Sequence, residues 1–478
     1  MNERLVLLPL LLHLLLCQQT TSAKLNITQP RSHQGIVRNM SLTQDDADFD
    51  VKNGIIDSET PPHTLLAALY KQSFAYYTFR VRLPSTLETI ANSLAKDKDE
   101  LLAIHGADVT SDIEQTVNEI RELRLNILQN GNLLPFTDNG SDTAVWNAFL
   151  EQLPQQQRTY FRACWLYAEC YMYRKVSSIF LTSKYLASYD YFSKQKQTAA
   201  QLSLDAMLAV ARGTRNSESN AATFQQLLKL NLWGNRCDLS ITSGKQIKPT
   251  GDALDLVKEL DDNLLVDNTN AIWQSLHSAN GEGIVEIICD NAGYELYTDL
   301  ILAEYIIDKG LAMKVRFNVK AIPWFISDVM SHDYHWTLQF LADQADPLLS
   351  ELGKKLKRLT DEGKFELAPL ENFWTSPYEF YRMAEVNAPL YDRLSQAQLV
   401  IFKGDLNYRK LLGDYSWNDT ESFDTCLRGF KPSNLCTLRT IKADLVCGLP
   451  QGLSQQLFAK NKEWMLTGEY GLIQFASK

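Results

Sequence analysis

The sequence predicts an α/β fold in which a helical N-terminal subdomain precedes a three-layer α/β/α Rossmann-like domain with a mostly parallel sheet. From residue 73 to about residue 235 the apolar residues recur at helical spacing. After that point short Ile- and Val-rich runs alternate with amphipathic stretches. The first pattern is typical of packed amphipathic helices and the second of βαβ units. We therefore expect a helical subdomain over residues 73–235 and an α/β domain over residues 236–478.

The first 72 residues show no sustained periodicity. Residues 1–23 contain Arg4, a leucine-rich run from Leu5 to Cys17 and a small-residue ending, which is the layout of a signal peptide or similar extension. The run is shorter than the ~20 apolar residues that span a bilayer, so no stable membrane insertion is expected. Residues 24–72 are largely polar and include the acidic stretch QDDADFD, which predicts a flexible extension.

The glycosylation patterns are compatible with secretion of the protein, whereas the cysteines argue against it. N-x-S/T patterns occur at Asn26, Asn39, Asn139 and Asn418, but a three-residue pattern often arises by chance. The eight cysteines form no compact pairing framework, and most are expected to be buried free thiols. Secretion therefore stays an open alternative.

The elements follow in order along the chain. In the helical subdomain, Leu101 begins a four-residue apolar spacing that QTVNEIRELRLNIL continues, and the aromatic-rich WLYAECYMYRKV is expected to pack in the core. In the α/β domain strands are expected at 284–289, 313–319, 364–368, 399–404 and 434–440. A helix follows the first strand and should end at Gly310.

The overall charge restricts the partners. The chain has 478 residues, a formal net charge of −10, 45% hydrophobic residues and 22% charged residues. These values are ordinary for a globular protein, and the acidic balance argues against nonspecific binding to nucleic acid or an anionic membrane. An anionic substrate would need a local cluster of cations.

Polar clusters follow four of the expected strands. Asp290 and Asn291 come after the first strand, Asp328 follows the second, and the remaining members are Asp405, Asn407, Arg409 and Lys410 after LVIFKG and Arg439, Thr440 and Lys442 at the end of the last run. In an open parallel sheet the ligand binds at the carboxyl ends of the strands. We therefore expect these clusters to form one site.

The types of side chain point to phosphoryl chemistry. Asp290, Asn291 and Asp328 offer oxygen ligands for a hard divalent cation such as Mg²⁺ or Mn²⁺, while Arg409 and Lys442 carry the opposite charge. A metal and fixed cations around one cavity match a transferring phosphoryl group. Taken one by one, these patterns are more often a helix cap, a turn or a surface carboxylate, and only their shared placement favours a site.

Other kinds of site lack their patterns. The seven histidines form no HxH or HxxxH pair, and Cys426, Cys436 and Cys447 lack CxxC spacing, which argues against zinc. There is no G-x-S-x-G elbow, P-loop or intact G-x-G-x-x-G.

The sequence resembles the damage-control phosphatase family, in the branch also called acidic residue methyltransferase, a protein-glutamate O-methyltransferase. The resemblance covers nearly everything after residue 72. It rests on SFAYYTFRVRLPSTLETIANSL, WLYAECYMYRKV, LWGNRCDLS, DNAGYELYTDLILAEYII, IPWFISD, FKGDLNYRKLLGD, LCTLRTIKAD and TGEYGLIQF. The residues before Ser73 have no counterpart in the family pattern.

The resemblance implies roles for particular residues. It implies that Asp290, Asn291 and Asp328 bind the metal, and that the residues contacting the substrate include Glu295, Lys442 and the DLNYR segment, which here is Asp405, Leu406, Asn407, Tyr408 and Arg409. Arg439, Thr440, Ile441 and Lys442 match its R-T-x-K signature. For the catalytic step we expect Asp290 at the metal and Asp405 as the proton carrier.

The resemblance also implies the reaction. Small sugar phosphates, fructose 1-phosphate and fructose 6-phosphate among them, would be hydrolysed in the cytoplasm with Mn²⁺, Ni²⁺ or Co²⁺. Two alternatives stay open. One is an S-adenosylmethionine-dependent protein-glutamate carboxyl methyltransferase with a protein acceptor, and the other is a catalytically inactive binding protein.

Overall fold

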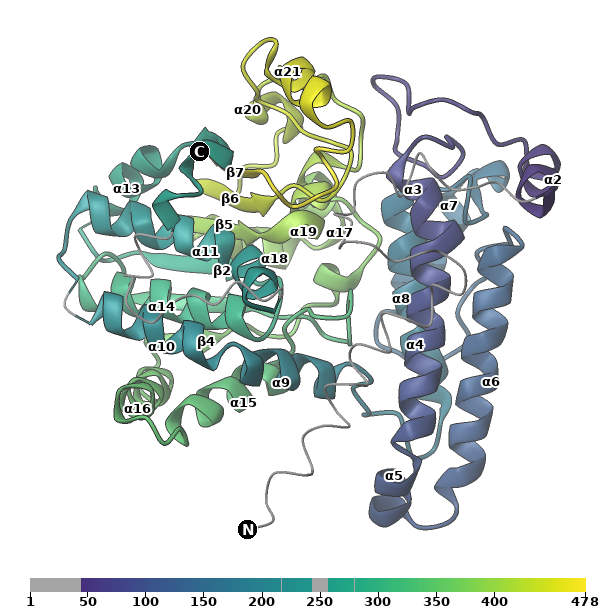
Figure 1. Ribbon diagram of the computed structural model, residues 1–478, viewed down its shortest axis with the longest axis horizontal. Helices are drawn as coiled ribbons and strands as arrows, with labels where there is room; N and C mark the ends of the chain where they lie inside the picture. The colour runs from purple at the N-terminus through teal and green to yellow at the C-terminus, as the bar shows by residue number, and fades with distance from the viewer. Residues whose placement is uncertain (1–43, 216, 243–256, 279) are drawn as a thin grey trace, which may run out of the picture. The chain divides into compact units, whose positions relative to one another are not determined.

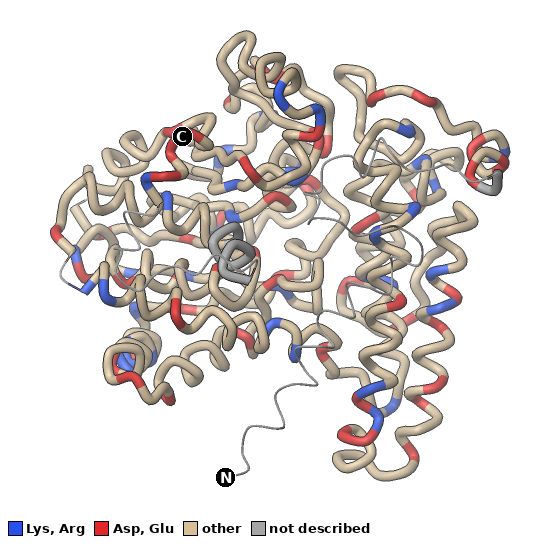
Figure 2. Tube along the Cα trace, in the orientation of Figure 1, with Lys and Arg blue, Asp and Glu red and all other residues tan. Residues whose placement is uncertain are grey.

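The computed structural model describes residues 44–215, 217–242, 257–278 and 280–478. The expected signal peptide over residues 1–23 and the patterns at Asn26 and Asn39 lie outside the described residues. Within the described ranges, no helix is both long and apolar enough to cross a membrane. Figure 2 shows Lys and Arg interspersed with Asp and Glu along the described trace.

The described residues contain a seven-stranded sheet with the order β1-β7-β6-β5-β2-β3-β4 (Figure 1). Neighbouring strands are parallel except β6 and β7, which pair antiparallel. The strands are β1 Leu264–Asp267, β2 Ile284–Ile288, β3 Lys314–Asn318, β4 Phe365–Leu367, β5 Leu399–Lys403, β6 Leu435–Thr440 and β7 Gly471–Ala476. The expected α/β fold with a mostly parallel sheet is confirmed. The five strands expected from the sequence correspond to β2–β6.

The order of the strands reverses between β2 and β5. From β2 the chain continues outward to β3 and β4 on one side, whereas β5, β6 and β7 continue on the other side. Such a reversal separates the two loops that leave the central strands and opens a crevice at their carboxyl ends. The segments after β2 and β5 therefore border the place where an open α/β sheet binds its ligand.

Helices precede the sheet and alternate with its strands. The first set is α2 Gln44–Asn53, α3 Phe74–Tyr77, α4 Leu83–Lys96, α5 Lys98–His105, α6 Val109–Leu128, α7 Thr143–Gln152, α8 Trp165–Thr182, α9 Ser193–Leu202, α10 Leu204–Thr214 and α11 Ala221–Thr242. The second set is α13 Thr269–His277, α14 Tyr294–Asp308, α15 Ser331–Ala342, α16 Pro347–Asp361, α17 Met383–Val386, α18 Ala388–Ser395, α19 Gly404–Leu412, α20 Phe423–Cys426 and α21 Leu453–Lys460.

Two hydrophobic cores lie on the two faces of the sheet. Along β5, Val400 and Phe402 belong to the first core, whereas Leu399 and Ile401 belong to the second. This alternation follows from the two-residue period of a strand. The first core includes side chains of α4, α6 and α8, which lie side by side in Figure 1, and the second includes side chains of α10, α11 and α14. Both faces of the sheet are therefore covered.

Helices α10 and α11 contribute to the core of the α/β part. Trp233 of α11 is fully buried in the second core, together with Val285 and Ile287 of β2. Helix α10 and most of α11 lie before residue 235, in the helical subdomain expected from the sequence. Their apolar faces pack on the sheet all the same, because that face of β2 needs a covering layer.

Residues 44–72 are ordered, which differs from the flexible extension expected from the sequence. Asp50 accepts a hydrogen bond from Tyr76 Oη at 2.7 Å and pairs with Lys71, and Asp46 pairs with Arg80. Leu66 is fully buried and its carbonyl accepts from Trp165 N at 2.8 Å. The acidic stretch therefore forms ion pairs with Lys71 and Arg80, which follow it in the chain. Local composition does not reveal these contacts.

The cysteines whose side chains the structure describes are all buried free thiols. They are Cys164, Cys170, Cys289, Cys426, Cys436 and Cys447. This agrees with the expectation from the sequence. Burial raises the pKa of most of them, including Cys289, which removes the thiolate that would react.

Candidate functional site

The loop after β3 returns to the end of β2. Asn291 and Asp328 form an antiparallel bridge, and Val329 N donates to Asp290 O at 2.8 Å. Because backbone hydrogen bonds tie the two segments together, the three side chains expected to bind a metal are neighbours. The structure therefore brings Asp290, Asn291 and Asp328 to one place at the carboxyl edge of the sheet.

A left-handed turn precedes Asp328. Phe325 and Ile326 have φ values of 42° and 73°. Side chains other than glycine rarely adopt this region, and a β-branched residue does so at a cost of about 1–3 kcal/mol. The turn is closed by Asp328 N, which donates to Trp324 O at 3.2 Å. The strained backbone at Phe325 and Ile326 thus places Asp328 beside the end of β2.

The amide of Asn291 joins three neighbours. Its Nδ2 donates to Asp290 Oδ2 at 2.9 Å and to Glu295 Oε2 at 2.7 Å. Its Oδ1 accepts from Ser327 Oγ at 2.5 Å and has a second lone pair. The amide therefore has a fixed orientation before any ligand binds.

The buried ammonium group of Lys403 forms an ion pair with Glu295. Lys403, at the end of β5, lies 2.9 Å from Glu295 Oε1 and 2.6 Å from Asp299 Oδ1. Burial raises the pKa of Glu295, but the charge of Lys403 and the Asn291 hydrogen bond outweigh it and leave this pKa lowered. Glu295 is therefore held as a carboxylate next to the Asn291 amide.

The two aspartates at the site have raised pKa values. Burial raises the pKa of Asp290 well above its usual value, and the carboxylates of Glu295 and Asp328 raise it further. Burial also raises the pKa of Asp328 to about 6, although Lys320 Nζ lies 3.1 Å from its Oδ2. An oxygen-rich site with too much negative charge fits a divalent cation.

The opposite wall comes from the segments after β5 and β6. Asp405 Oδ1 accepts from Arg439 Nε at 2.8 Å and from Lys442 N at 3.1 Å, which fixes the carboxylate. The positive charge of Lys442 lowers the pKa of Asp290 against the larger effects that raise it. Lys442 and Asp290 line the same cavity.

Arg409 lies at the same wall with its charge already balanced. Its guanidinium donates to Asp414 at 2.7 and 3.0 Å and to Glu169 at 2.7 Å, and it stacks on Trp165 at 3.6 Å. Burial lowers the pKa of Arg409, but these two carboxylates raise it well above its usual value. The side chain joins α19 to α8 of the helical region.

The other residues of the expected motifs have structural contacts. Asn407 Nδ2 donates to Lys403 O at 2.7 Å, and Tyr408 Oη lies 3.4 Å from Cys447 Sγ. Thr440 and Ile441 are buried. Leu406 lines the site. The motif therefore supplies both the wall of the site and the packing behind it.

These side chains surround a cavity of about 290 Å³. Five of its lining residues were not predicted from the sequence, namely Arg82, Trp165, Glu169, Phe325 and Ser327. Phe325 and Ser327 adjoin Asp328 in the chain. The other three come from the helical region, where their spacing is that of ordinary helix residues. The stretches SFAYYTFRVRLP and WLYAEC contain them, but nothing local marks them as part of a site.

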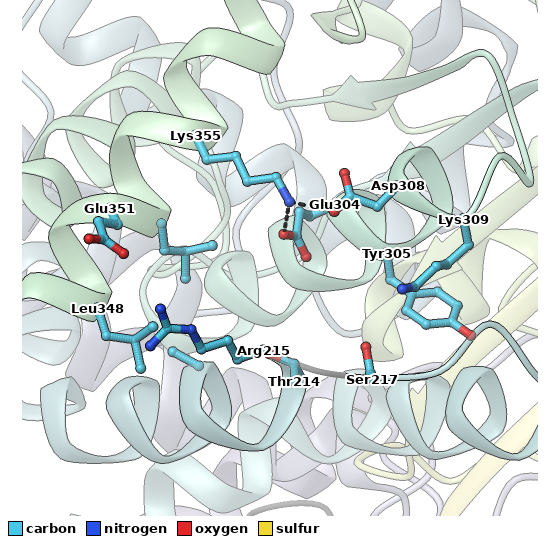
Figure 3. Close-up of a pocket in the computed structure, with 12 residues that line it drawn as sticks. Thr214, Arg215, Ser217, Glu304, Tyr305, Asp308, Lys309, Leu348, Glu351 and Lys355 are labelled. Carbon is cyan, nitrogen blue, oxygen red and sulfur yellow. Dashed lines mark hydrogen bonds and ion pairs between the residues drawn. The ribbon is translucent and has the colours of Figure 1, made fainter.

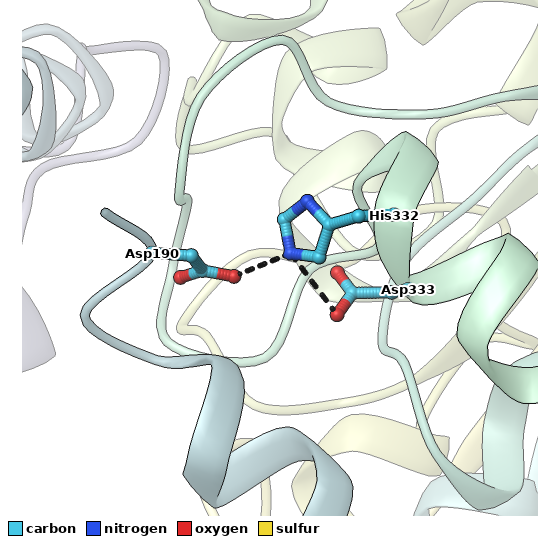
Figure 4. Close-up of side chains that lie close together, drawn as sticks. All are labelled: Asp190, His332 and Asp333. Atoms are coloured by element: carbon cyan, nitrogen blue, oxygen red, sulfur yellow. Dashed lines mark hydrogen bonds and ion pairs between the residues drawn. The ribbon is translucent and has the colours of Figure 1, made fainter. Parts of the chain in front are cut away.

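A second cluster of ligand types lies outside this cavity. Asp190, His332 and Asp333 lie close enough to share an ion (Figure 4). However, Lys196 Nζ lies 2.8 Å from Asp190 and 2.5 Å from Asp333. The ammonium group already pairs with both carboxylates, so we interpret this cluster as an ion-pair network.

A separate cavity of about 210 Å³ lies between α10, α14 and α16 (Figure 3). Its charged lining includes Lys355, which pairs with Glu304 and Asp308. None of the residues expected to act in catalysis lines it.

Comparisons with known proteins agree with the resemblance. A family model described as the damage-control phosphatase ARMT1-like domain matches residues 78–457. Damage-control phosphatase ARMT1 of Danio rerio is 35% identical over 438 residues, which cover 87% of this chain and 97% of the relative. The human protein of that name is 32% identical over 424 residues, covering 84% and 96%.

One solved structure also aligns with the chain. It is a DUF89 family protein from Pyrococcus horikoshii, with a TM-score of 0.41 and 16% identity, covering 78% of this chain and 96% of that one. The family model and the long relatives together establish membership. The chain belongs to the ARMT1-like damage-control phosphatase family, whose name supports an enzyme that acts on small phosphorylated metabolites.

Proposed function

We propose that the protein is a metal-dependent phosphatase that hydrolyses small sugar phosphates, with fructose 1-phosphate and fructose 6-phosphate as the first substrates to test. Asp290, Asn291 and Asp328 would hold the cation. Mn²⁺, Ni²⁺ or Co²⁺ is the expected metal, and Mg²⁺ suits the same oxygen ligands. The proposal deepens the family assignment by naming the substrate class and the metal ligands.

One observation carries the proposal. Asp290 and Asp328 converge at the reversal of strand order, where burial and then repulsion from the carboxylates of Glu295 and Asp328 raise the pKa of Asp290. A divalent cation would remove that repulsion and is the group whose binding such an arrangement favours. When bound, the cation would polarise a phosphoryl oxygen.

The remaining residues position the substrate and move a proton. Lys442 lines the same cavity as Asp290, and we assign it to binding the phosphoryl oxygens. Asp405, oriented by Arg439, is our candidate proton carrier at its second carboxylate oxygen. Arg409 pairs with Glu169 and Asp414, so we assign it to holding the wall in place rather than to the direct role expected from the sequence.

Phosphate release by the full chain tests the proposal. The protein is stripped with a chelator and assayed on fructose 1-phosphate, with Mn²⁺, Ni²⁺, Co²⁺ and Mg²⁺ added in turn. We expect turnover only with added metal. Asp290→Ala and Asp328→Asn should each lose at least about a hundredfold in turnover and bind metal more weakly.

His332→Gln is the matched control, because it removes a ligand from the other cluster. Its turnover and metal affinity should equal those of the wild type. If His332→Gln loses metal while Asp290→Ala keeps it, the assigned metal site is wrong. Calorimetry with S-adenosylmethionine addresses the alternative reaction, since tight binding without metal would favour methyl transfer.

A further inference from the structure

Arg82 reaches the candidate site from the helical region. It lines the same cavity as Asp290, Asp328 and Lys442 although it lies more than 200 residues before them in the chain. Its side chain is exposed. The helical region thus contributes a cation to a site whose other charged residues come mostly from the edge of the sheet.

The backbone at Arg82 is unusual. Residues Thr78–Arg82 form a π-helical turn, η1, between α3 and α4, and Leu83 N donates to Thr78 O. Pro84 follows and has no N–H to continue the regular helical pattern. Wide turns of this kind are rare and occur often at functional sites, because the inserted residue changes the direction of its neighbours.

The guanidinium of Arg82 has few partners. Its Nη1 donates to Thr78 Oγ1 at a long 3.4 Å, and the group lies 5.0 Å from the centre of the Phe74 ring. It forms no ion pair with the described residues. Arg409, in contrast, has two carboxylate partners. Of the two arginines at this cavity, Arg82 is therefore the one whose charge is available to a ligand.

The segment that carries Arg82 is tied to the segment that carries Lys442. Phe74 N donates to Asp444 Oδ2 at 3.1 Å, and the Phe74 ring packs edge-on against Trp165 at 5.7 Å. Asp444 follows Lys442 by two residues. These contacts fix the segment that carries Arg82 against the segment that carries Lys442. The positions of Arg82 and Lys442 relative to each other are therefore set by the fold.

We propose that Arg82 binds the phosphoryl group of the substrate and sets the preference of this site for phosphate monoesters. The inference rests on the proposed function and extends it to a residue to which the family resemblance assigned no role. A guanidinium offers paired N–H donors that match phosphate oxygens, and an exposed one keeps them free until the substrate arrives. Arg82 is a substrate-binding residue and does not act on the reacting bond itself.

Steady-state kinetics of Arg82→Gln, Arg82→Lys and Arg121→Gln test this. Arg121 is a half-exposed arginine of α6 away from the cavity and serves as the control. Arg82→Gln should raise the KM for fructose 1-phosphate about tenfold or more, with a smaller change in kcat. Arg82→Lys should recover part of the loss, because it keeps the charge without the paired donors. Arg121→Gln should match the wild type.

Calorimetry with inorganic phosphate gives a readout that does not need turnover. In metal-loaded protein, Arg82→Gln should bind phosphate about tenfold more weakly than the wild type, at an unchanged melting temperature. Equal KM and equal phosphate affinity in the two proteins would overturn the role of Arg82 while leaving the phosphatase intact. A wild type that binds phosphate but hydrolyses no sugar phosphate would instead count against the proposed function alone. A wild type that binds no phosphate would overturn the inference.

Discussion

Gly404 packs directly against the carboxylate of Asp290. A Cβ at position 404 would lie 2.0 Å from Asp290 Oδ2, and Gly404 has a φ of 82°. The end of β5 therefore comes as close to the end of β2 as a residue without a side chain permits. Asp290 can occupy its position only because Gly404, the residue that follows β5, has no side chain.

Gly404→Ala should displace Asp290. We expect loss of metal affinity and of at least about 90% of turnover, because the ligand moves out of coordination distance. Gly429→Ala is the control, since Gly429 also has a φ of 82° but a Cβ added there would meet no described atom within 4 Å. Both variants should lose about 1–2 kcal/mol of stability from the positive φ. Equal activity in the two variants would contradict the dependence of Asp290 on Gly404.

Lys403→Met should destabilise the fold strongly. Its ammonium group is buried between Glu295 and Asp299, and removing it leaves two buried carboxylates unpaired, at a cost of about 3–5 kcal/mol. Lys355→Met is the matched control, because Lys355 also bridges two carboxylates but is 29% exposed. Its loss should cost at most about 1 kcal/mol. Urea unfolding measures both, and similar losses would show that burial does not set the difference.

Asp138 should make stability depend on acidity. Burial raises its pKa, but hydrogen bonds from Arg174, Ser178 and Thr143 outweigh burial, so the pKa is lowered in the folded state. A carboxyl with a lowered folded pKa stabilises the fold above its unfolded pKa, and this contribution is lost as the pH falls. Asp138→Asn should therefore be less stable than the wild type at pH 7, and the gap should begin to narrow below about pH 4 as the pH falls toward the folded pKa.

Unfolding in urea from pH 7 to pH 3 measures this gap. A gap that stays constant over the whole range would mean that the charge of Asp138 does not contribute.

Asp405→Asn should impair chemistry without unfolding the protein. The amide oxygen can still accept from Arg439 and from Lys442 N, so the wall should keep its geometry. A proton carrier contributes about 10²–10⁴-fold, and we expect kcat to fall by that amount with little change in metal affinity. Turnover within about tenfold of the wild type would exclude Asp405 as the proton carrier.

The parallel strands were the part of the fold that the sequence predicted best. β2 and β5 are mostly buried runs rich in Ile and Val, which is the composition of strands covered on both faces. In β3, the apolar residues Val315 and Phe317 alternate with Lys314 and Arg316. β1 and β7 were not predicted. β1 has four residues that are partly buried or exposed at the edge of the sheet, and β7 returns antiparallel to β6, so neither shows the βαβ pattern.

Some residues of the candidate site could be predicted from the sequence and others could not. Asp290, Asp328, Asp405 and Lys442 follow strands, and the carboxyl ends of parallel strands meet at one edge, so their approach could be inferred from order alone. Arg82, Trp165 and Glu169 come from helices whose residues show only the spacing of packed helices. Their arrival at the cavity depends on how those helices dock on the sheet.

The sequence by itself determined the α/β class, the strands that carry the site and the oxygen-bearing residues at their ends, because strand composition and turn chemistry are local properties. Only the tertiary structure decided that residues 44–72 pack, that Asp414 and Glu169 balance Arg409, and that Arg82 lines the cavity without a carboxylate partner among the described residues. Those outcomes depend on contacts between residues far apart in the chain, which local patterns do not encode.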